Sequence, residues 1–273
     1  MIFLAIIFSF NSCFCNFSPH PNDWKRMSRK VSISRTAGNR MLHAMLHVKD
    51  IDESLNFYQD LGMKVLSCNR RPNGAATAFV GFGTLRDMEN FALELSAQKR
   101  SEKENAGINL GSFQGLTVSQ LEAPDSDSRT DPDGYPIQIR QQKQAEILGL
   151  CLNTRDLKAS TTFYTQKLGM SVVEGPAGGE SVGKDVCYLK YPSGAETYLC
   201  LRQSEVPIEL GTGFDHLVIA TSDVEAAAEQ LQQKGVKIAL PPTVMFGLKI
   251  TGVVDDDGYK IYLVDESDFQ KGL

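Results

Sequence analysis

An internal duplication constrains the fold of this 273-residue chain more than any other feature. The segment 41–65, MLHAMLHVKDIDESLNFYQDLGMKV, returns in related form at 147–172 as ILGLCLNTRDLKASTTFYTQKLGMSV. Each copy then runs to an aspartate-rich turn, at 131–134 and at 255–258. Self-similarity at a fixed period indicates that one supersecondary unit is built more than once, so we interpret the chain as a tandem repeat.

Each copy begins with the pattern of a strand, a helix and a second strand. In the first copy, apolar residues alternate with His43, Met45 and His47, which predicts a strand with one apolar face and two imidazoles on the other. Asp50 or Asp52 can cap the helix that follows, because a carboxylate before the first turn accepts hydrogen bonds from the N–H groups of that turn.

Further short strands complete each copy. They are predicted near 76–81, 91–96, 113–118, 186–191, 196–202 and 214–220, with another helix over 223–234. Segment 214–258 reads as a strand, a helix and more strands, whereas the matching segment 113–134 is much shorter, and 119–133 has no strand or helix period. The sequence therefore predicts an α+β fold of four tandem βαβββ modules, with modules one and two in the first repeat and modules three and four in the second. The second module, which contains 113–134, is truncated relative to module four, which contains 214–258.

The first forty residues differ from the rest of the chain. Residues 2–10 form an apolar run that is too short to span a bilayer and suits a signal-peptide core. Residues 23–40 carry six basic residues and one acid and resemble an organelle transit peptide. This combination is typical of import into plastids of secondary origin, and an uncleaved leader on a secreted or cytosolic protein is the alternative. The predicted organisation is a leader at 1–40, repeats at 41–140 and 146–265, and a tail at 266–273.

Charge and cysteine content limit the kinds of partner. Beyond the leader the chain carries a net charge of about −10, which disfavours nucleic acid and anionic membranes. No further segment is apolar enough to predict an integral membrane span. Four scattered cysteines remain, without CxxC spacing, which indicates reduced thiols, with neither a disulfide framework nor a zinc cluster. A small-molecule ligand and a monomer or homodimer are therefore expected.

Four motifs, taken in order, carry a family resemblance. They resemble motifs of the vicinal oxygen chelate superfamily and, within it, of glyoxalase I (lactoylglutathione lyase). The four motifs are LHAMLHVKDIDESLNFYQDLGMKVL, FALEL, GTGFDHLVIATSDVEAAAEQLQQKG and DDDGYKIYLVD. The tandem arrangement is similar to plant-type two-repeat glyoxalases, and the short second module to glyoxalase domain-containing proteins. The resemblance implies that paired modules curl into a cup around one divalent metal ion.

Carried over by residue, the resemblance assigns His43 and Glu94 of module one and His216 of module four as metal ligands. Tyr262 stands where the family has a second glutamate. Two imidazoles and a carboxylate suit Ni(II), Zn(II), Mn(II) or Fe(II). At the corresponding places of modules two and three stand Gln114 or Gly115, Gln138, Gly149 and Cys200, so no second metal site is expected.

The resemblance also implies a lyase reaction in which the methylglyoxal–glutathione hemithioacetal is isomerised to lactoylglutathione. The metal would acidify a C–H beside the hemithioacetal oxygen, and Glu94 would move the proton. Tyr262 is a candidate acid/base, or else an aromatic ring that fills the space of the lost glutamate. Met45 and His47 are candidate substrate-binding residues, His47 at the place of a family arginine that holds the glutathione carboxylate.

Two other functions stay open from the sequence. One is a different metalloenzyme of the same superfamily, such as a dioxygenase. The other is a binding protein that keeps the cup without chemistry, which the departures at Tyr262 and His47 and the truncated second module favour. The aspartate-rich turn at 255–258 resembles a calcium loop, but a tight turn with glycine in the left-handed conformation is the simpler interpretation.

Overall fold

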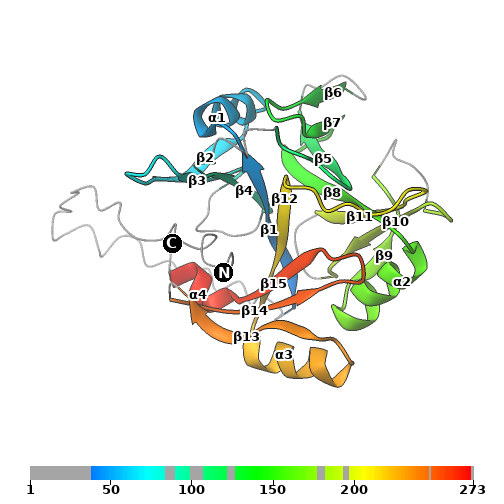
Figure 1. Ribbon diagram of the computed structural model, residues 1–273. Helices are drawn as coiled ribbons and strands as arrows, with labels where there is room; N and C mark the ends of the chain where they lie inside the picture. The colour runs from blue at the N-terminus through cyan, green and yellow to red at the C-terminus, as the bar shows by residue number, and fades with distance from the viewer. Residues whose placement is uncertain are drawn as a thin grey trace.

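The computed structural model, drawn in Figure 1, describes residues 38–83, 90–98, 107–121, 127–176, 182–192, 197–245 and 247–271. The strands are β1 (Arg40–Val48), β2 (Lys64–Arg70), β3 (Ala76–Gly81), β4 (Ala92–Ala97), β5 (Phe113–Gln120), β6 (Asp127–Thr130), β7 (Pro136–Gln141), β8 (Glu146–Thr154), β9 (Ser171–Val173), β10 (Val186–Lys190), β11 (Tyr198–Gln203), β12 (Phe214–Thr221), β13 (Ile238–Met245), β14 (Leu248–Val254) and β15 (Lys260–Asp265). The helices are α1 (Ile51–Asp60), α2 (Leu157–Thr162) with its π-helical continuation η3 (Phe163–Lys167), α3 (Val224–Gln233) and α4 (Glu266–Lys271).

The ends of the chain bear on two of the sequence predictions. Of the predicted leader, only residues 38–40 are described, so the signal and transit-like segments lie outside the described residues. The predicted tail begins with the short helix α4. A search of the described residues finds no helix with the length and apolar character that a membrane crossing requires.

Two mixed sheets form the molecule (Figure 1). The first has the strand order β13-β14-β15-β12-β1-β4-β3-β2, and the second β6-β7-β5-β8-β11-β10-β9. Modules one and four share the first sheet through the antiparallel pair β1/β12, and modules two and three share the second through β5/β8. Each sheet therefore combines one module from each sequence repeat, which is the arrangement needed to bring module one against module four.

Local sequence explains the helices. Asp50, Asp156 and Asp223 each precede a helix and accept hydrogen bonds from N–H groups of its first turn. Of the two cap candidates of α1, Asp50 is the cap, while Asp52 forms an ion pair with Arg70 on β2. Gly62 follows α1 with φ +83°, a left-handed conformation that ends a helix without a Cβ penalty.

The second module contains β5, β6 and β7. Six residues, 121–126, separate β5 from β6, and five of them lie outside the described residues. The ten-residue helices of modules one and four have no counterpart among the described residues of this module, and loss of elements from a once complete module stays a prediction. One expectation was wrong: segment 119–133 contains the strand β6, which pairs antiparallel with β7. Its sequence, DSRT, is polar throughout and lies at a sheet edge, so it lacks the apolar period by which strands are found.

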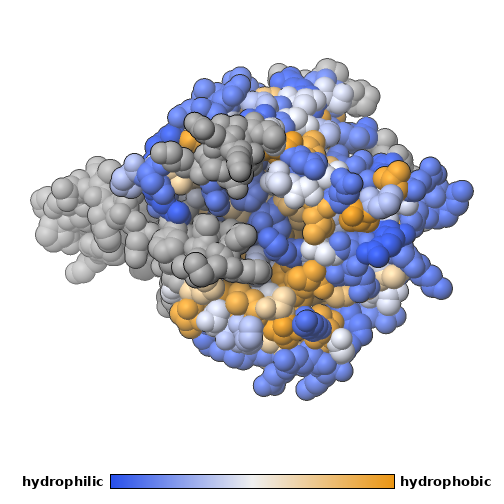
Figure 2. All heavy atoms as spheres, viewed as in Figure 1, coloured by the Kyte–Doolittle hydropathy of each residue, from blue (hydrophilic) through white to orange (hydrophobic). Residues whose placement is uncertain are grey.

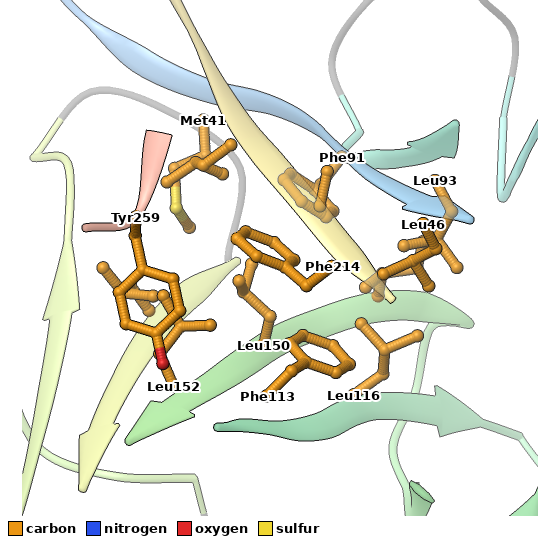
Figure 3. Close-up of a cluster of buried hydrophobic side chains, with 14 of the residues drawn as sticks. Met41, Leu46, Phe91, Leu93, Phe113, Leu116, Leu150, Leu152, Phe214 and Tyr259 are labelled. Atoms are coloured by element: carbon orange, nitrogen blue, oxygen red, sulfur yellow. The ribbon is translucent and has the colours of Figure 1, made fainter. Parts of the chain in front are cut away.

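The main core lies between the two sheets (Figure 3). Phe113 of β5 stacks on Phe214 of β12 with ring centroids 5.3 Å apart, and Tyr259 meets Phe214 edge-on. These rings join the first strand of module two to module four. The opposite face of the first sheet, turned away from this core, is the face on which the candidate site lies.

In each aspartate-rich turn, a buried aspartate accepts a hydrogen bond from a buried tyrosine. The Tyr58 hydroxyl of α1 donates to Asp131 Oδ2 at 3.0 Å, and in the second repeat Tyr164 of η3 donates to Asp255 Oδ2 at 2.9 Å. The other oxygen of each aspartate accepts two backbone N–H groups of its own turn. The duplicated tyrosines and the duplicated turns therefore act together, because each tyrosine joins a helix on one sheet to a turn on the other.

Burial of Asp255 makes stability depend on pH. Burial raises the pKa of its carboxyl to about 6, although hydrogen bonds from Tyr164 and the Tyr259 N–H favour the charged form. A folded-state pKa above the unfolded value means that the contribution of Asp255 is fully present below about pH 4 and is lost as the pH rises through about 6. We expect Asp255→Asn to remove this loss, worth up to ~3 kcal/mol at ~1.4 kcal/mol per pKa unit.

The measurement is the free energy of unfolding in urea between pH 4 and pH 8 for the wild type and Asp255→Asn. The difference between the two should grow in favour of the variant as the pH rises. Asp256→Asn, at the exposed neighbour, is the control and should follow the wild-type curve. A constant difference between wild type and Asp255→Asn across the range contradicts the prediction.

Candidate metal centre

The three predicted ligands meet at the middle of the first sheet. His43 of β1, Glu94 of β4 and His216 of β12 each offer a ligand atom, and these atoms all lie within 4.8 Å of one another. His43 Nε2 is 3.2 Å from Glu94 Oε2. All three side chains are buried. In the part of the chain that the structure describes, this is the one group of three or more His, Cys, Asp or Glu residues with such spacing.

Strand register explains why these side chains converge. Met45 is directly opposite Glu94 on one neighbouring strand and directly opposite His216 on the other. Residues opposite one another in a ladder project from the same face, and so does His43, two positions before Met45. The Met45 side chain therefore lies on the same face of the sheet, between the three ligand side chains, and it is only 1% exposed. Its role in substrate binding stays a prediction.

The electrostatics of His43 suit a metal ligand. Burial lowers the pKa of its imidazole, although the hydrogen bond and the negative charge of Glu94 act in the opposite direction. A lowered pKa keeps the imidazole neutral at physiological pH, and a neutral ring nitrogen is the form that coordinates a metal. The donor set of two imidazoles and one buried carboxylate therefore fits a divalent ion of the Ni, Zn, Mn or Fe type.

Asp215 is a residue of the site that sequence reasoning missed. Its Oδ2 is 2.7 Å from His216 Nδ1, and its Oδ1 is 2.9 Å from Lys260 Nζ and 3.7 Å from His47 Nε2. Burial opposes its charge, but the hydrogen bond with His216, the nearby His47 ring and the hydrogen bond from Lys260 hold the pKa of the carboxyl well below its usual range. The carboxylate thus fixes Nδ1 of His216 as the protonated nitrogen and leaves Nε2 for a metal.

A β-bulge turns the Asp215 side chain toward the His216 ring. Adjacent residues of a regular strand point to opposite faces, so the sequence FDHL predicts an aspartate turned away from the histidine. The pairing of β1 with β12 shifts between Met45 and Leu46, which leaves Asp215 as the extra residue of a bulge. A bulge re-aims side chains. No apolar period marks a bulge, so the acid before the histidine was the only signal available in the sequence.

Tyr262 occupies the place in module four that Glu94 occupies in module one. Tyr262 is opposite Val218, two residues after His216, as Glu94 is opposite Met45, two residues after His43. Its ring meets the His216 ring edge-on, with centroids 4.9 Å apart. Burial and the negative charge of Asp215 raise the pKa of its phenol, which makes it a weaker acid than free tyrosine and keeps it in the neutral form at physiological pH.

Gly252 makes room for the Tyr262 ring. The two residues are directly opposite on β14 and β15, and a Cβ on Gly252 would lie 2.8 Å from ring atoms of Tyr262. In module one the equivalent pair is Phe79 and Glu94, and the Phe79 ring lies edge-on to His43 with centroids 5.1 Å apart. Each half thus has one aromatic ring beside its histidine, but the ring comes from different strands. A space-filling ring at Tyr262 is compatible with this packing, and its acid/base role stays a prediction.

His47 and Lys260 lie at one end of the site. The His47 side chain is 19% exposed and the Lys260 side chain 36%, and Asp215 lies between them. Figure 2 shows apolar residues gathered over β13, β14 and β15. On these strands, Tyr262, Leu248 and Met245 pack on a buried cluster that includes Ile250 and Val264, and the strand register places this cluster toward the end of β15 that lies away from Lys260. The site therefore has an apolar flank and a polar, charged rim.

Among the residues that the structure describes, the second sheet brings together no comparable set of His, Cys, Asp or Glu side chains. The register places Gly149, Cys200, Gly115 and Gln138 at the positions equivalent to His43, Glu94, His216 and Tyr262. A Cβ on Gly149 would lie 2.4 Å from the Tyr198 ring, and one on Gly115 would lie 2.2 Å from the Pro136 carbonyl oxygen. Side chains that could bind a metal do not fit at either glycine.

Comparisons with known proteins agree with this geometry. Residues 146–263 match the family model for the Glyoxalase/Bleomycin resistance protein/Dioxygenase superfamily. The chain is 30% identical to a lactoylglutathione lyase of Oryza sativa over 86% of its length and 92% of that protein. It is 28% identical to a probable chloroplastic lactoylglutathione lyase of Arabidopsis thaliana, covering 75% of it. The crystal structure of glyoxalase I from Zea mays superposes with a TM-score of 0.72 at 26% identity, over 85% of this chain and 94% of that one.

Proposed function

Because this chain belongs to the glyoxalase superfamily and, within it, to the lactoylglutathione lyase family, we propose that it is a metal-dependent glyoxalase I-like enzyme. Its substrate would be the hemithioacetal of methylglyoxal and glutathione, and its product lactoylglutathione. The observation that carries the proposal is the buried convergence of His43, Glu94 and His216 within 4.8 Å. Relatives that bear the name lactoylglutathione lyase support the choice of reaction.

In the proposed mechanism, His43, Glu94 and His216 hold one divalent ion. A bound divalent ion would act there as a Lewis acid toward the substrate. Asp215 holds the proton on Nδ1 of His216, which would leave Nε2 available as a ligand atom. Glu94 would take the proton from one substrate carbon and return it to the adjacent carbon, since it is the only carboxylate among the three clustered residues.

The rim accounts for substrate binding in this proposal. His47 stands at the position where the family resemblance implies an arginine, and a neutral imidazole forms no bidentate ion pair with a carboxylate. Lys260, held by Asp215 at the same end of the site, would supply the positive charge toward the glutathione carboxylates. Met45 would lie under the reacting atoms and exclude water from them.

The direct test is turnover of methylglyoxal with glutathione by the full-length protein, together with metal analysis. We expect one divalent ion per chain, loss of turnover on chelation, and recovery when Ni(II), Zn(II), Mn(II) or Fe(II) is returned. A metal-loaded protein without such turnover contradicts the glyoxalase proposal. Oxygen uptake with a catecholic substrate would then favour a dioxygenase of the same superfamily, and ligand binding without turnover would favour a binding protein.

We also propose an organellar location, namely a plastid reached through the leader at 1–40. The apolar run at 2–10 followed by the basic segment 23–40 supports it, as does the chloroplastic relative of A. thaliana. Imaging of the full chain with a fluorescent protein at its C-terminus would test this location against secretion or retention in the cytosol.

A further inference from the structure

Two cysteines lie side by side on the second sheet. Cys151 of β8 and Cys200 of β11 are directly opposite one another in a parallel ladder, and their Sγ atoms are 3.1 Å apart. Both are thiols that no disulfide joins. The sequence separates them widely, so the expectation of scattered, unrelated thiols missed this pair; only the register of β8 with β11 brings it together.

The backbone geometry suits a disulfide. Neighbouring strands lie about 4.8 Å apart, which falls inside the Cα–Cα range of about 4.4–6.8 Å found for disulfides. Directly opposite residues send their side chains from the same face, so the two Cβ atoms also point the same way. The gap between the Sγ atoms exceeds an S–S bond of about 2.05 Å by roughly 1 Å, a distance that small side-chain rotations close.

The surroundings distinguish the two thiols. Cys200 is 4% exposed and lies in a buried cluster with Tyr188 and Tyr198. Those two rings meet edge-on with centroids 5.2 Å apart. Cys151 is partly exposed and packs against the rim of that cluster. A small solute therefore reaches Cys151 first, and once formed the bond is shielded on the Cys200 side.

We propose that Cys151 and Cys200 form a redox modification site at which a peroxide makes a disulfide between β8 and β11. The Cys151 thiol gives up its proton, and the thiolate attacks one oxygen of hydrogen peroxide and breaks the O–O bond. Cys151 becomes a sulfenic acid, and the departing hydroxide takes up that proton and leaves as the first water. The Cys200 thiol then attacks the Cys151 sulfur and displaces its oxygen as a second water. The two cysteines lose two electrons and two protons, and hydrogen peroxide is reduced to two water molecules.

The site is the counterpart of the candidate metal centre on the other sheet. Cys200 stands at the register position of Glu94, and Cys151 at that of Met45. Where the first sheet holds a metal-ligand set, the second sheet holds a dithiol. The inference does not rest on the proposed glyoxalase activity, because its readouts are bond mapping and thiol number.

The experiment uses the full chain with Cys13, Cys15 and Cys68 changed to serine, which leaves three of the six cysteines. After hydrogen peroxide treatment, remaining thiols are alkylated and the protein is digested and mapped by mass spectrometry. We expect thiols to fall from three per chain to one. The peptides of Cys151 and Cys200 should be joined, with the mass of two hydrogen atoms lost, and the join should disappear after reduction.

Cys187 is the internal control. It lies on β10 opposite Leu201, and it packs in the main core on the other face of the sheet. It should stay alkylatable. In the same background, Cys200→Ser should stop the reaction at the Cys151 sulfenic acid, which a cyclic diketone traps. If Cys151 and Cys200 both stay alkylatable, or if Cys187 is consumed as fast, the proposal is wrong. Mapping in the Cys200-containing background decides this even where Cys200→Ser does not fold.

Discussion

Glu94→Gln should cost the protein both its metal ion and its turnover. We expect metal affinity to fall at least ~100-fold and kcat/KM for methylglyoxal with glutathione to fall at least ~1,000-fold. Glutamine keeps the shape of the side chain, but its neutral amide is a poor metal ligand and cannot accept a proton from carbon. Both losses follow because Glu94 is the only carboxylate of the His43–Glu94–His216 cluster.

The measurements are metal content by mass spectrometry, metal titration by calorimetry, and steady-state kinetics with saturating metal. Glu229→Gln removes an exposed carboxylate of α3 and is the matched control, which should keep wild-type values. Unfolding curves should show that Glu94→Gln is folded. A folded Glu94→Gln protein that keeps its metal and its turnover would remove the basis of the proposed mechanism.

Tyr262→Glu should produce the largest gain. The variant restores a carboxylate at the register position that matches Glu94 in module one, so we expect divalent-metal affinity to rise about 10- to 100-fold, the size of change that a well-placed group in a metal site confers. Turnover should rise as well, because a second carboxylate can share the proton transfer. Tyr262→Phe keeps the ring against His216 and removes only the hydroxyl.

These variants separate the two interpretations of Tyr262. If the residue fills space, Tyr262→Phe changes kcat less than about twofold, whereas loss of a general acid or base costs about 100-fold or more.

Gly252 supplies a further comparison. Gly252→Ala alone should destabilise the fold by ~1–3 kcal/mol through overpacking against the Tyr262 ring, and the cost should shrink in the Tyr262→Glu background, where that ring is gone. Equal costs in both backgrounds contradict the packing argument.

Features that repeat locally were available from the sequence. The helix cap before α1, the helix over 223–234 and the strands β1 and β12 follow from the 3.6- and 2-residue periods and from side chains that bond to nearby backbone. The aspartate-rich turns were also predicted as turns, but their bonds to Tyr58 and Tyr164 were not. Those bonds join residues far apart in sequence, and no local pattern records them.

The residues of the candidate site also divide into those that the sequence predicted and those that only the structure revealed. His43, Glu94 and His216 were found because a family resemblance supplied their spacing, and the structure places them together. The sequence did not predict Asp215 as part of the site, because a bulge turns its side chain toward His216. That bulge depends on how β12 pairs with β1. The fit of Tyr262 over Gly252 was not predicted either, since it depends on two strands meeting in register.

By itself, the sequence determined that this protein is a duplicated α+β chain with capped helices, amphipathic strands and three ligand-type residues in recognisable motifs. Only the tertiary structure decided that modules one and four share a sheet, that Asp215 supports His216, and that Cys151 faces Cys200. The physical reason is the separation along the chain over which each kind of interaction acts. Helix caps and strand periods are set by neighbours within a few residues, whereas strand partners, bulges and cross-strand pairs are set by which distant segments bury their apolar faces together.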